Sequence, residues 1–338
     1  MADARAAAAR GGRRGIGIGI GDLPVDVLLR VLSRLAAREV PRTCVLSRRW
    51  RDLWRSVPRI HASFREFDDG AGADEECNAR FKAFVSRFLM LRDPVGLDEF
   101  RLCYNLPDES RDVHADSADA NLWIGHAIQC NARSVEVSIY DQRLCLDPAV
   151  FASKCLTSLE LSHAILPPGS FRNFQTGCTR LERLILKDCA IEDAEICSQT
   201  LKFLMSLSGV TNLDFSYDGK RCLMLKMDEN LRWCPKFNNL TVLTLGEWCV
   251  HADFYGLIVF LQNSPNLVKL TLELDQDRRS YHTVDTFTGV LKERSFTCEH
   301  LRTVEITCSE ADPMCRRVEK FFHENGITSD LVKIVHWM

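Results

Sequence analysis

Residues 264–274 read SPNLVKLTLEL, a phrase whose pattern returns along most of the chain. It contains apolar-x-x-apolar-x-apolar as Leu267, Leu270 and Leu272, and a Pro-Asn pair typical of turns comes directly before it. Residues two apart on a β-strand point to the same side, so Leu270 and Leu272 face one core while Leu267 anchors the chain that enters the strand. One such strand cannot enclose a core, and the phrase therefore predicts that similar strands stack beside it.

Copies of this phrase are spaced like the units of a repeat protein. The clear copies are Leu156-Leu159-Leu161, Leu181-Leu184-Leu186, Leu240-Leu243-Leu245 and Leu267-Leu270-Leu272, and the weaker ones are Leu97-Phe100-Leu102, Val135-Val137, Val210-Leu213-Phe215 and Leu301-Val304-Ile306. From residue 156 onward they begin 25 to 34 residues apart, a period that fits leucine-rich repeats. Between them, stretches such as residues 252–262 have the apolar spacing of helices. We predict an α/β leucine-rich-repeat solenoid, with a parallel sheet on its concave face and helices on its convex face.

An ordinary alternating α/β domain is the alternative, because leucine is common. A nucleotide-binding version of that domain needs a glycine-rich phosphate turn after its first strand, and the sequence has none. Residues 201–215, LKFLMSLSGVTNLDF, run one repeat phrase into the next. The middle of the solenoid is therefore expected to be short and less regular.

A different pattern occupies the N-terminal part, where residues 22–56 read DLPVDVLLRVLSRLAAREVPRTCVLSRRWRDLWRS. From Pro24 the apolar residues recur at spacings of three and four, which predicts an amphipathic helix with proline in its first turn. A second helix is expected to begin between residues 37 and 41, because Pro41 is tolerated only in a first turn. It would place Trp50 and Trp54 on one side. About forty residues are too few to bury so much leucine and tryptophan, so this unit needs a partner surface.

Three phrases of this segment carry a resemblance: Leu23-Pro24, then LLRVLSRL, then VLSRRWRDLW. Together they resemble the F-box, a motif of about forty residues. The resemblance implies that the helices bind a Skp-type adaptor, which joins F-box proteins to a cullin-based ubiquitin ligase. The residues expected to make this contact are Leu23, Pro24, Leu28, Leu32, Val45, Trp50, Leu53 and Trp54.

The C-terminal segment CEHLRTVEITCSEADPMCRRVEKFFHENGI, residues 298–327, resembles the FBD motif. It offers a repeat-like strand, an apolar-faced helix and then Asn325-Gly326, which is a helix-ending signal. The whole arrangement is similar to a plant-type family with an F-box, leucine-rich repeats and an FBD segment. The expected division is a disordered tail at 1–21, the F-box at 22–60, a linker and helix at 61–96, the solenoid at 97–297 and an FBD-like segment at 298–338.

Composition narrows the function classes. No apolar run approaches the 18 to 20 residues that a membrane span requires, which favours a soluble protein without a membrane partner. The 15 cysteines are scattered without a CxxC pair, as expected for reduced thiols in the nucleus or the cytoplasm. Residues 1–60 hold 13 arginines against five acidic residues. Nucleic-acid binding is nevertheless disfavoured, since these arginines are interleaved with an apolar helical face.

Catalytic and metal-binding patterns were not found in the sequence: it has no HExxH, no GxSxG and no Walker-type phosphate loop. No catalytic residue, cofactor or metal is predicted. The expected function is substrate recognition for a Skp-cullin-F-box ubiquitin ligase, with the repeats binding a target protein that no motif identifies. The alternative is a repeat scaffold whose F-box-like segment merely caps the solenoid. The two differ in whether the face bearing Leu28, Leu32, Trp50 and Trp54 packs against the repeats or stays available.

Overall fold

The fold is known from a computed structural model. It describes residues 20, 23–68, 74–105, 113–140, 144–148, 152–166, 177–187, 189–191, 207, 209–216, 234–274, 294–310 and 312–336. The tail predicted at 1–21 lies outside these residues except for Ile20, and so does most of 201–208.

The N-terminal unit consists of two short helices followed by three 3-10 turns. They are α1 (Val25–Leu32), α2 (Glu39–Arg42), η2 (Thr43–Val45), η3 (Arg48–Trp50) and η4 (Leu53–Ser56). The second helix begins within the predicted window, and Pro41 lies in its first turn. The prediction that this helix continues through Trp54 is wrong. The backbone of Ser47 is extended, with φ −166° and ψ 170°, so helical hydrogen bonding stops there and resumes only in separate turns.

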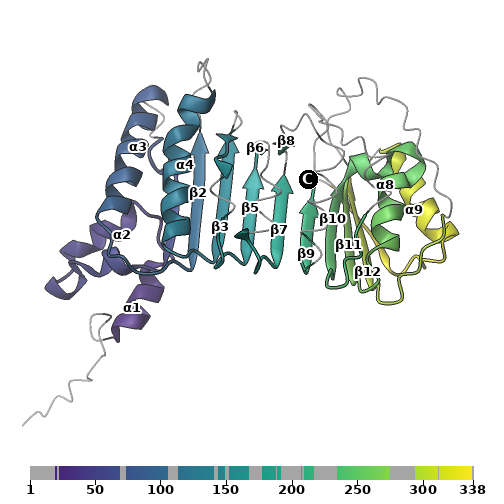
Figure 1. Ribbon diagram of the computed structural model, residues 1–338, viewed down its shortest axis with the longest axis horizontal. Coiled ribbons are helices and arrows are strands. Elements are labelled where there is room, and N and C mark those ends of the chain that lie inside the picture. The colour runs from purple at the N-terminus through teal and green to yellow at the C-terminus, as the bar shows by residue number, and fades with distance from the viewer. Residues whose placement is uncertain are drawn as a thin grey trace, which may run out of the picture.

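In the described part of the chain, a parallel sheet of ten strands forms the body of the protein (Figure 1). In spatial order the strands are β1 (Arg59–Ser63), β2 (Glu99–Asn105), β3 (Ser134–Tyr140), β5 (Ser158–Ser162), β7 (Arg183–Lys187), β9 (Asn212–Phe215), β10 (Val242–Gly246), β11 (Lys269–Glu273), β12 (Thr303–Cys308) and β13 (Val332–His336). Every neighbouring pair is parallel, which confirms the predicted solenoid.

The leucines of the repeat phrase form a continuous row across this sheet. The first strand leucines of the four clear copies, Leu159, Leu184, Leu243 and Leu270, are all fully buried. Leu159 is paired with Leu184, and Leu243 with Leu270, while Leu213 joins the two pairs. Stacking equivalent side chains in this way removes each repeat's apolar face from water, which no single repeat can do. β9 pairs on both sides, so the sheet is continuous through the middle despite the compressed sequence there.

Helices and a small second sheet cover the apolar side. They are α3 (Asp74–Met90), α4 (Val113–Gln129), η8 (Glu247–Val250), α8 (His251–Gln262), α9 (Pro313–Glu324) and the short strands β4 (Leu144–Cys145), β6 (Ala164–Leu166) and β8 (Ala190–Ile191). Figure 1 places α3 and α4 at the N-terminal end of the sheet and α8 and α9 at the other. The described part of the middle is covered by β4, β6 and β8, so the predicted helical cover is confirmed only at the two ends.

The sheet begins earlier than the predicted solenoid boundary at residue 97. β1 precedes that boundary. Its copy of the repeat phrase, Val57, Ile60 and Ala62, has the apolar-x-x-apolar-x-apolar spacing but was not recognised in the sequence. β13 extends the sheet at the other end, where Ser329 replaces the first apolar residue of the phrase. In the predicted FBD-like segment, α9 ends at Glu324 and Gly326 follows with φ +82°, as its helix-ending signal predicts.

Candidate adaptor-binding surface

The apolar face of the N-terminal unit that the sequence assigned to a partner is largely internal. Leu28 and Leu32 on α1 are fully buried, and Trp50 in η3 is only 3% exposed. All three belong to the same hydrophobic core as the first strands of the sheet. Such side chains stabilise the fold but offer almost no area to a partner in this conformation.

Trp54 packs against the helix that follows the N-terminal unit. Its ring lies 5.4 Å from the ring of Phe88 on α3, and the guanidinium of Arg55 lies over it at 5.7 Å. Leu23 and Leu53 are partly buried against the same core. Of the eight predicted contact residues, the structure therefore leaves Pro24 and Val45 exposed and turns the others wholly or partly inward.

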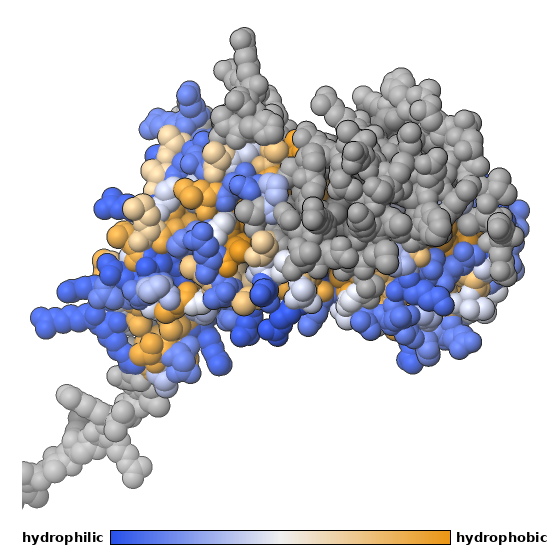
Figure 2. Space-filling view, in the orientation of Figure 1, coloured by the Kyte–Doolittle hydropathy of each residue, from blue (hydrophilic) through white to orange (hydrophobic). Residues whose placement is uncertain are grey.

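A second set of apolar side chains on this unit is exposed, and four of its members were not predicted. Val45 is 83% exposed and Leu46 is 62% exposed, both at the end of η2. The others are Val25, Val31 and Leu35. On the face seen in Figure 2, hydrophobic side chains lie among hydrophilic ones over the α1 and α2 end of the molecule. These side chains are the apolar part of the unit that remains accessible to a partner.

The same unit carries several exposed arginines. Arg42 pairs with Glu39 at 2.6 Å, and Arg49 donates a 2.6 Å hydrogen bond to the carbonyl oxygen of Leu23, which joins η3 to the start of α1. Further exposed arginines of this unit are Arg30, Arg34, Arg48 and Arg51. These arginines outnumber the exposed acidic residues of the unit, Asp26, Glu39 and Asp52, and this excess of positive charge would favour a partner with acidic side chains.

Several hydrogen bonds join the N-terminal unit to the sheet. The backbone N–H of Ala37 donates to the carbonyl oxygen of His61 in β1 at 2.8 Å. Arg38 donates to the carbonyl oxygen of Glu66, and its guanidinium lies 4.6 Å from the centre of the Phe67 ring. The carboxylate of Glu66 accepts the backbone N–H of Arg38 at 3.2 Å, while burial raises the pKa of this carboxyl group.

Hydrogen bonds also join the end of the N-terminal unit to the residues that follow α3. Asp93 accepts the hydroxyl of Ser56 at 2.6 Å, and its backbone N–H donates to the carbonyl oxygen of Arg55. The guanidinium of Arg92 is buried and donates to the carbonyl oxygen of Val57 at 2.8 Å. The N-terminal unit and the start of the sheet are therefore one packed body.

The outward face of the sheet is polar and carries ion pairs between neighbouring strands. Arg101 on β2 contacts Glu136 on β3 at 2.7 Å, and Lys269 on β11 contacts Glu305 on β12 at 2.9 Å. Near the centre, Lys187 lies 3.4 Å from Glu160. Because these charges are matched strand by strand, the face has no single dominant sign along the described strands.

Asp214, at the centre of this face, is nearly buried at 9% exposure. Burial raises the pKa of its carboxyl group, while Ser216 and Lys187 act in the opposite direction. Burial alone would lower the pKa of Lys187, but the carboxylates of Glu160 and Asp214 raise it. Within the described residues, no group of three or more His, Cys, Asp or Glu side chains is arranged to hold a metal ion. No described helix is both long and apolar enough to cross a membrane.

Comparison with known families identifies the N-terminal unit. The F-box domain model matches residues 20–61. This unit is an F-box. The F-box therefore includes α1, α2 and the three 3-10 turns, and its last matched residues reach into β1.

Relatives that match most of the chain are named F-box/LRR-repeat proteins, some of them with an FBD segment. An F-box/FBD/LRR-repeat protein of Arabidopsis thaliana is 31% identical over 284 residues, covering 81% of this chain and 53% of the relative. Another from the same plant is 29% identical over 355 residues, covering 91% of this chain and 74% of the relative. An Arabidopsis F-box/LRR-repeat protein is 24% identical over 260 residues, covering 76% and 68%. The predicted resemblance to F-box/FBD/LRR proteins is confirmed, although the chain spans only about half the length of the first of these relatives.

Proposed function

We propose that this chain is the substrate-recognition adaptor of a Skp-cullin-F-box ubiquitin ligase. The F-box supports an adaptor role in ubiquitin ligase complexes in general. The observation that carries the finer proposal is the exposed apolar set on the F-box, Val25, Val31, Leu35, Val45 and Leu46, together with the excess of exposed arginines on the same unit. In this proposal the Skp-type adaptor covers that set, and the outward face of the sheet binds a target protein.

The contact residues of this proposal differ from those expected from the sequence. Val45 and Pro24 remain as direct contacts, Leu46 and its exposed neighbours join them, and Leu28, Leu32 and Trp50 support the surface from inside. The chemistry of ubiquitin transfer belongs to other subunits. This chain supplies proximity, since a bound target is held at high effective concentration near the transferring enzyme.

A scaffold without a ligase role is the second candidate. It is favoured by the packing of Leu28, Leu32, Trp50 and Trp54 against the rest of the chain, because this is how a helical cap covers a solenoid. Capping and adaptor binding use opposite sides of the F-box, so the inward packing does not decide between them. The exposed side must be tested directly.

The test is a binding measurement with a purified Skp-type adaptor and the full chain. Changing both Val45→Glu and Leu46→Glu places two charges on the exposed set and should weaken binding at least about thirtyfold, the loss that corresponds to about 2 kcal/mol at an interface centre. Leu122→Glu on α4 is the matched control, because Leu122 is 66% exposed but lies outside the F-box. No adaptor binding by the unchanged chain would leave the scaffold as the better account. Equal binding by the double variant would instead show that the adaptor contact does not include Val45 and Leu46.

A further inference from the structure

The two edges of the ten-stranded sheet differ in how their outer backbone groups are bonded. At β1, the carbonyl oxygen of His61 accepts the backbone N–H of Ala37 at 2.8 Å. On the same strand, the backbone N–H of Ser63 donates to the carboxylate of Glu66 at 3.2 Å. At β13, no described strand pairs on the outer side. An open edge strand presents a row of N–H and C=O groups that can pair with another chain.

The hydrogen bonds between β12 and β13 show which backbone groups of β13 remain free. The N–H of Val304 on β12 donates to the carbonyl oxygen of Leu331 at 2.8 Å. Alternate residues of a parallel strand bond to the same neighbour, so Lys333 and Val335 also face β12. The N–H and C=O of Ile334 therefore point away from the sheet, and neither has a partner among the described residues.

The apolar side chains of β13 are exposed although one of them continues a row of the core. Ile334 is aligned with Ile306 on β12, which is aligned with Leu272 on β11. Ile306 and Leu272 are fully buried, whereas Ile334 is 40% exposed. Val335, on the other face of the strand, is 42% exposed. A further strand beside β13 would cover Ile334 as β13 covers Ile306, because side chains opposite each other on neighbouring strands are in contact.

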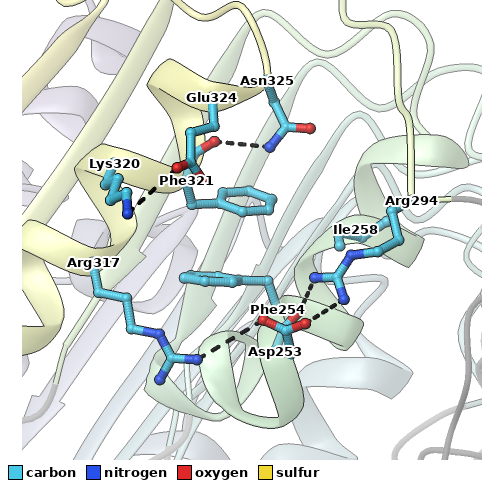
Figure 3. A pocket seen from close by; sticks show the side chains of 9 residues that line it. All are labelled: Asp253, Phe254, Ile258, Arg294, Arg317, Lys320, Phe321, Glu324 and Asn325. Carbon is cyan, nitrogen blue, oxygen red and sulfur yellow. Dashed lines mark hydrogen bonds and ion pairs between the residues drawn. The ribbon is translucent and has the colours of Figure 1, made fainter.

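The helix between β12 and β13, α9, packs against α8. In Figure 3 the ring of Phe321 on α9 lies over the ring of Phe254 on α8, with ring centres 4.2 Å apart. Arg294 binds the carboxylate of Asp253 beside this pair. These contacts hold α9 next to the preceding repeat, and Ile334 remains accessible.

We propose that β13 pairs with β13 of a second copy of this chain, as antiparallel strands related by a two-fold axis at Ile334. A two-fold interface uses the same surface of both copies. Ile334 would lie opposite its own counterpart, and the two residues would exchange both of their free backbone hydrogen bonds. The F-box lies at the opposite edge of the sheet, β1, so this pairing does not use it and does not depend on the proposed ligase role.

The side chains of β13 are compatible with themselves in this register. Lys333 lies opposite Val335 of the second copy, so the two lysines do not meet. This matters because like charges directly opposite each other destabilise a strand pair. The two Ile334 side chains meet at the axis and would be removed from water together.

Pairing of β13 with β1 of another copy is the competing arrangement. It would join unlike edges and so produce an open filament of copies. The F-box disfavours it, because Ala37 and Glu66 already bond to outer backbone groups of β1. The two-fold pair has no such obstacle among the described residues.

The proposed interface is small, since β13 is a strand of five residues. Small interfaces give weak and reversible association, so we expect a dissociation constant of about 10 to 100 µM. Sedimentation velocity of the full chain between about 1 and 300 µM should show a dimer that grows with concentration. A chain that stays monomeric throughout would overturn the proposal and leave the edge to a strand of another protein.

Hydrogen exchange followed by NMR tests the backbone pairing itself. The amide of Ile334 should exchange more slowly as the dimer forms. The amides of Lys333 and Val335 should change little, because they are already bonded to β12. A dimer in which the Ile334 amide exchanges as fast as in the monomer would overturn the pairing.

Two variants with opposite expected effects test the register. Ile334→Lys places two like charges opposite each other at the axis and should weaken association at least about tenfold. Val335→Glu places a carboxylate opposite Lys333 of the second copy, twice in each dimer, and should strengthen association about threefold. Leu122→Lys on α4 is the matched control, because Leu122 is 66% exposed and lies outside β13.

Circular dichroism melting checks that the variants are folded. Association of folded Ile334→Lys at the strength of the unchanged chain would place the contact elsewhere and overturn the proposal. Weaker association of Val335→Glu would overturn the antiparallel register, since a surface that is merely apolar loses area in this variant. If Ile334→Lys fails to fold, Val335→Glu and the exchange of the Ile334 amide still decide the outcome.

Discussion

The backbone N–H of Ala37 in the F-box donates a 2.8 Å hydrogen bond to the carbonyl oxygen of His61 in β1. β1 is the first strand of the ten-stranded sheet, and an edge strand normally leaves its backbone groups free to pair with another chain. The F-box thus covers part of this edge. Its buried side forms the end of the repeat core, while its other side keeps the exposed apolar set.

His61 should make the stability of the protein depend on pH. Burial, and then the positive charge of Arg101, lower the pKa of His61 below its ordinary value of 6.5. Since the folded pKa is depressed, the stabilising contribution is complete above the unfolded value and is lost as pH falls through 6.5 toward the folded one. The contribution of His61 to the free energy of urea unfolding should therefore be smaller at about pH 5 than at about pH 7.

The variant His61→Gln should reduce this loss of stability, because its side chain does not titrate. It should not abolish the loss, since burial also lowers the pKa of His126, which is retained in the variant. Carboxyl groups contribute the same background to both proteins, so the informative quantity is the difference between them. An identical pH dependence in the two proteins would contradict the assignment to His61.

Trp50→Ala should act on folding rather than directly on adaptor binding. Trp50 is almost completely buried, and removing a buried tryptophan side chain costs about 3 to 5 kcal/mol of unfolding free energy. Leu46→Ala, at a 62% exposed position, should change the unfolding free energy by no more than about 0.5 kcal/mol. Urea unfolding followed by tryptophan fluorescence and far-UV circular dichroism measures both. A stable Trp50→Ala protein would show that this side chain is not part of the core.

Leu243→Ala tests the row of leucines at the centre of the sheet. Leu243 is fully buried and lies between Leu213 and Leu270, so its truncation should cost about 2 to 5 kcal/mol. Thr244→Ala is the neighbouring control, because alternate residues of a strand point to opposite faces and Thr244 is on the polar one. Hydrogen exchange should show faster exchange of the amides of β9 to β11 in the leucine variant alone. Equal effects of the two changes would contradict the assigned faces.

Strand positions were predictable because the repeat phrase combines two constraints: a leucine anchor and a period of two on the strand. Leu270 and Leu272 reach the core only when the chain satisfies both constraints. The phrase therefore predicted the strands correctly even where its copies are weaker. β1 was missed because Ala62 stands at its last apolar position, and alanine is a weak hydrophobic signal. β13 was missed because Ser329 stands where the first apolar residue is expected.

The candidate adaptor surface was harder to predict than the fold. Apolar spacing identifies one face of a helix but does not say whether that face meets another protein or the same chain. Leu28 and Trp50 met the pattern and are buried by the protein's own strands, whereas Leu46 is exposed because Ser47 interrupts the helix beside it. Apolar spacing alone does not encode this interruption. The open edge at β13 was not predictable either, because the repeat phrase identifies strands but not which of them lies at an edge of the sheet.

The contacts of Trp54 with Phe88, of Ala37 with His61 and of Arg92 with Val57 leave no hinge between the F-box and the sheet. If the F-box binds the protein to a ligase, the orientation of the sheet relative to the ligase is fixed by the folded structure. A target on the outward face would then approach the transferring enzyme from one side and at one separation. Which of its lysines receives ubiquitin would then depend on where each lysine lies on the target.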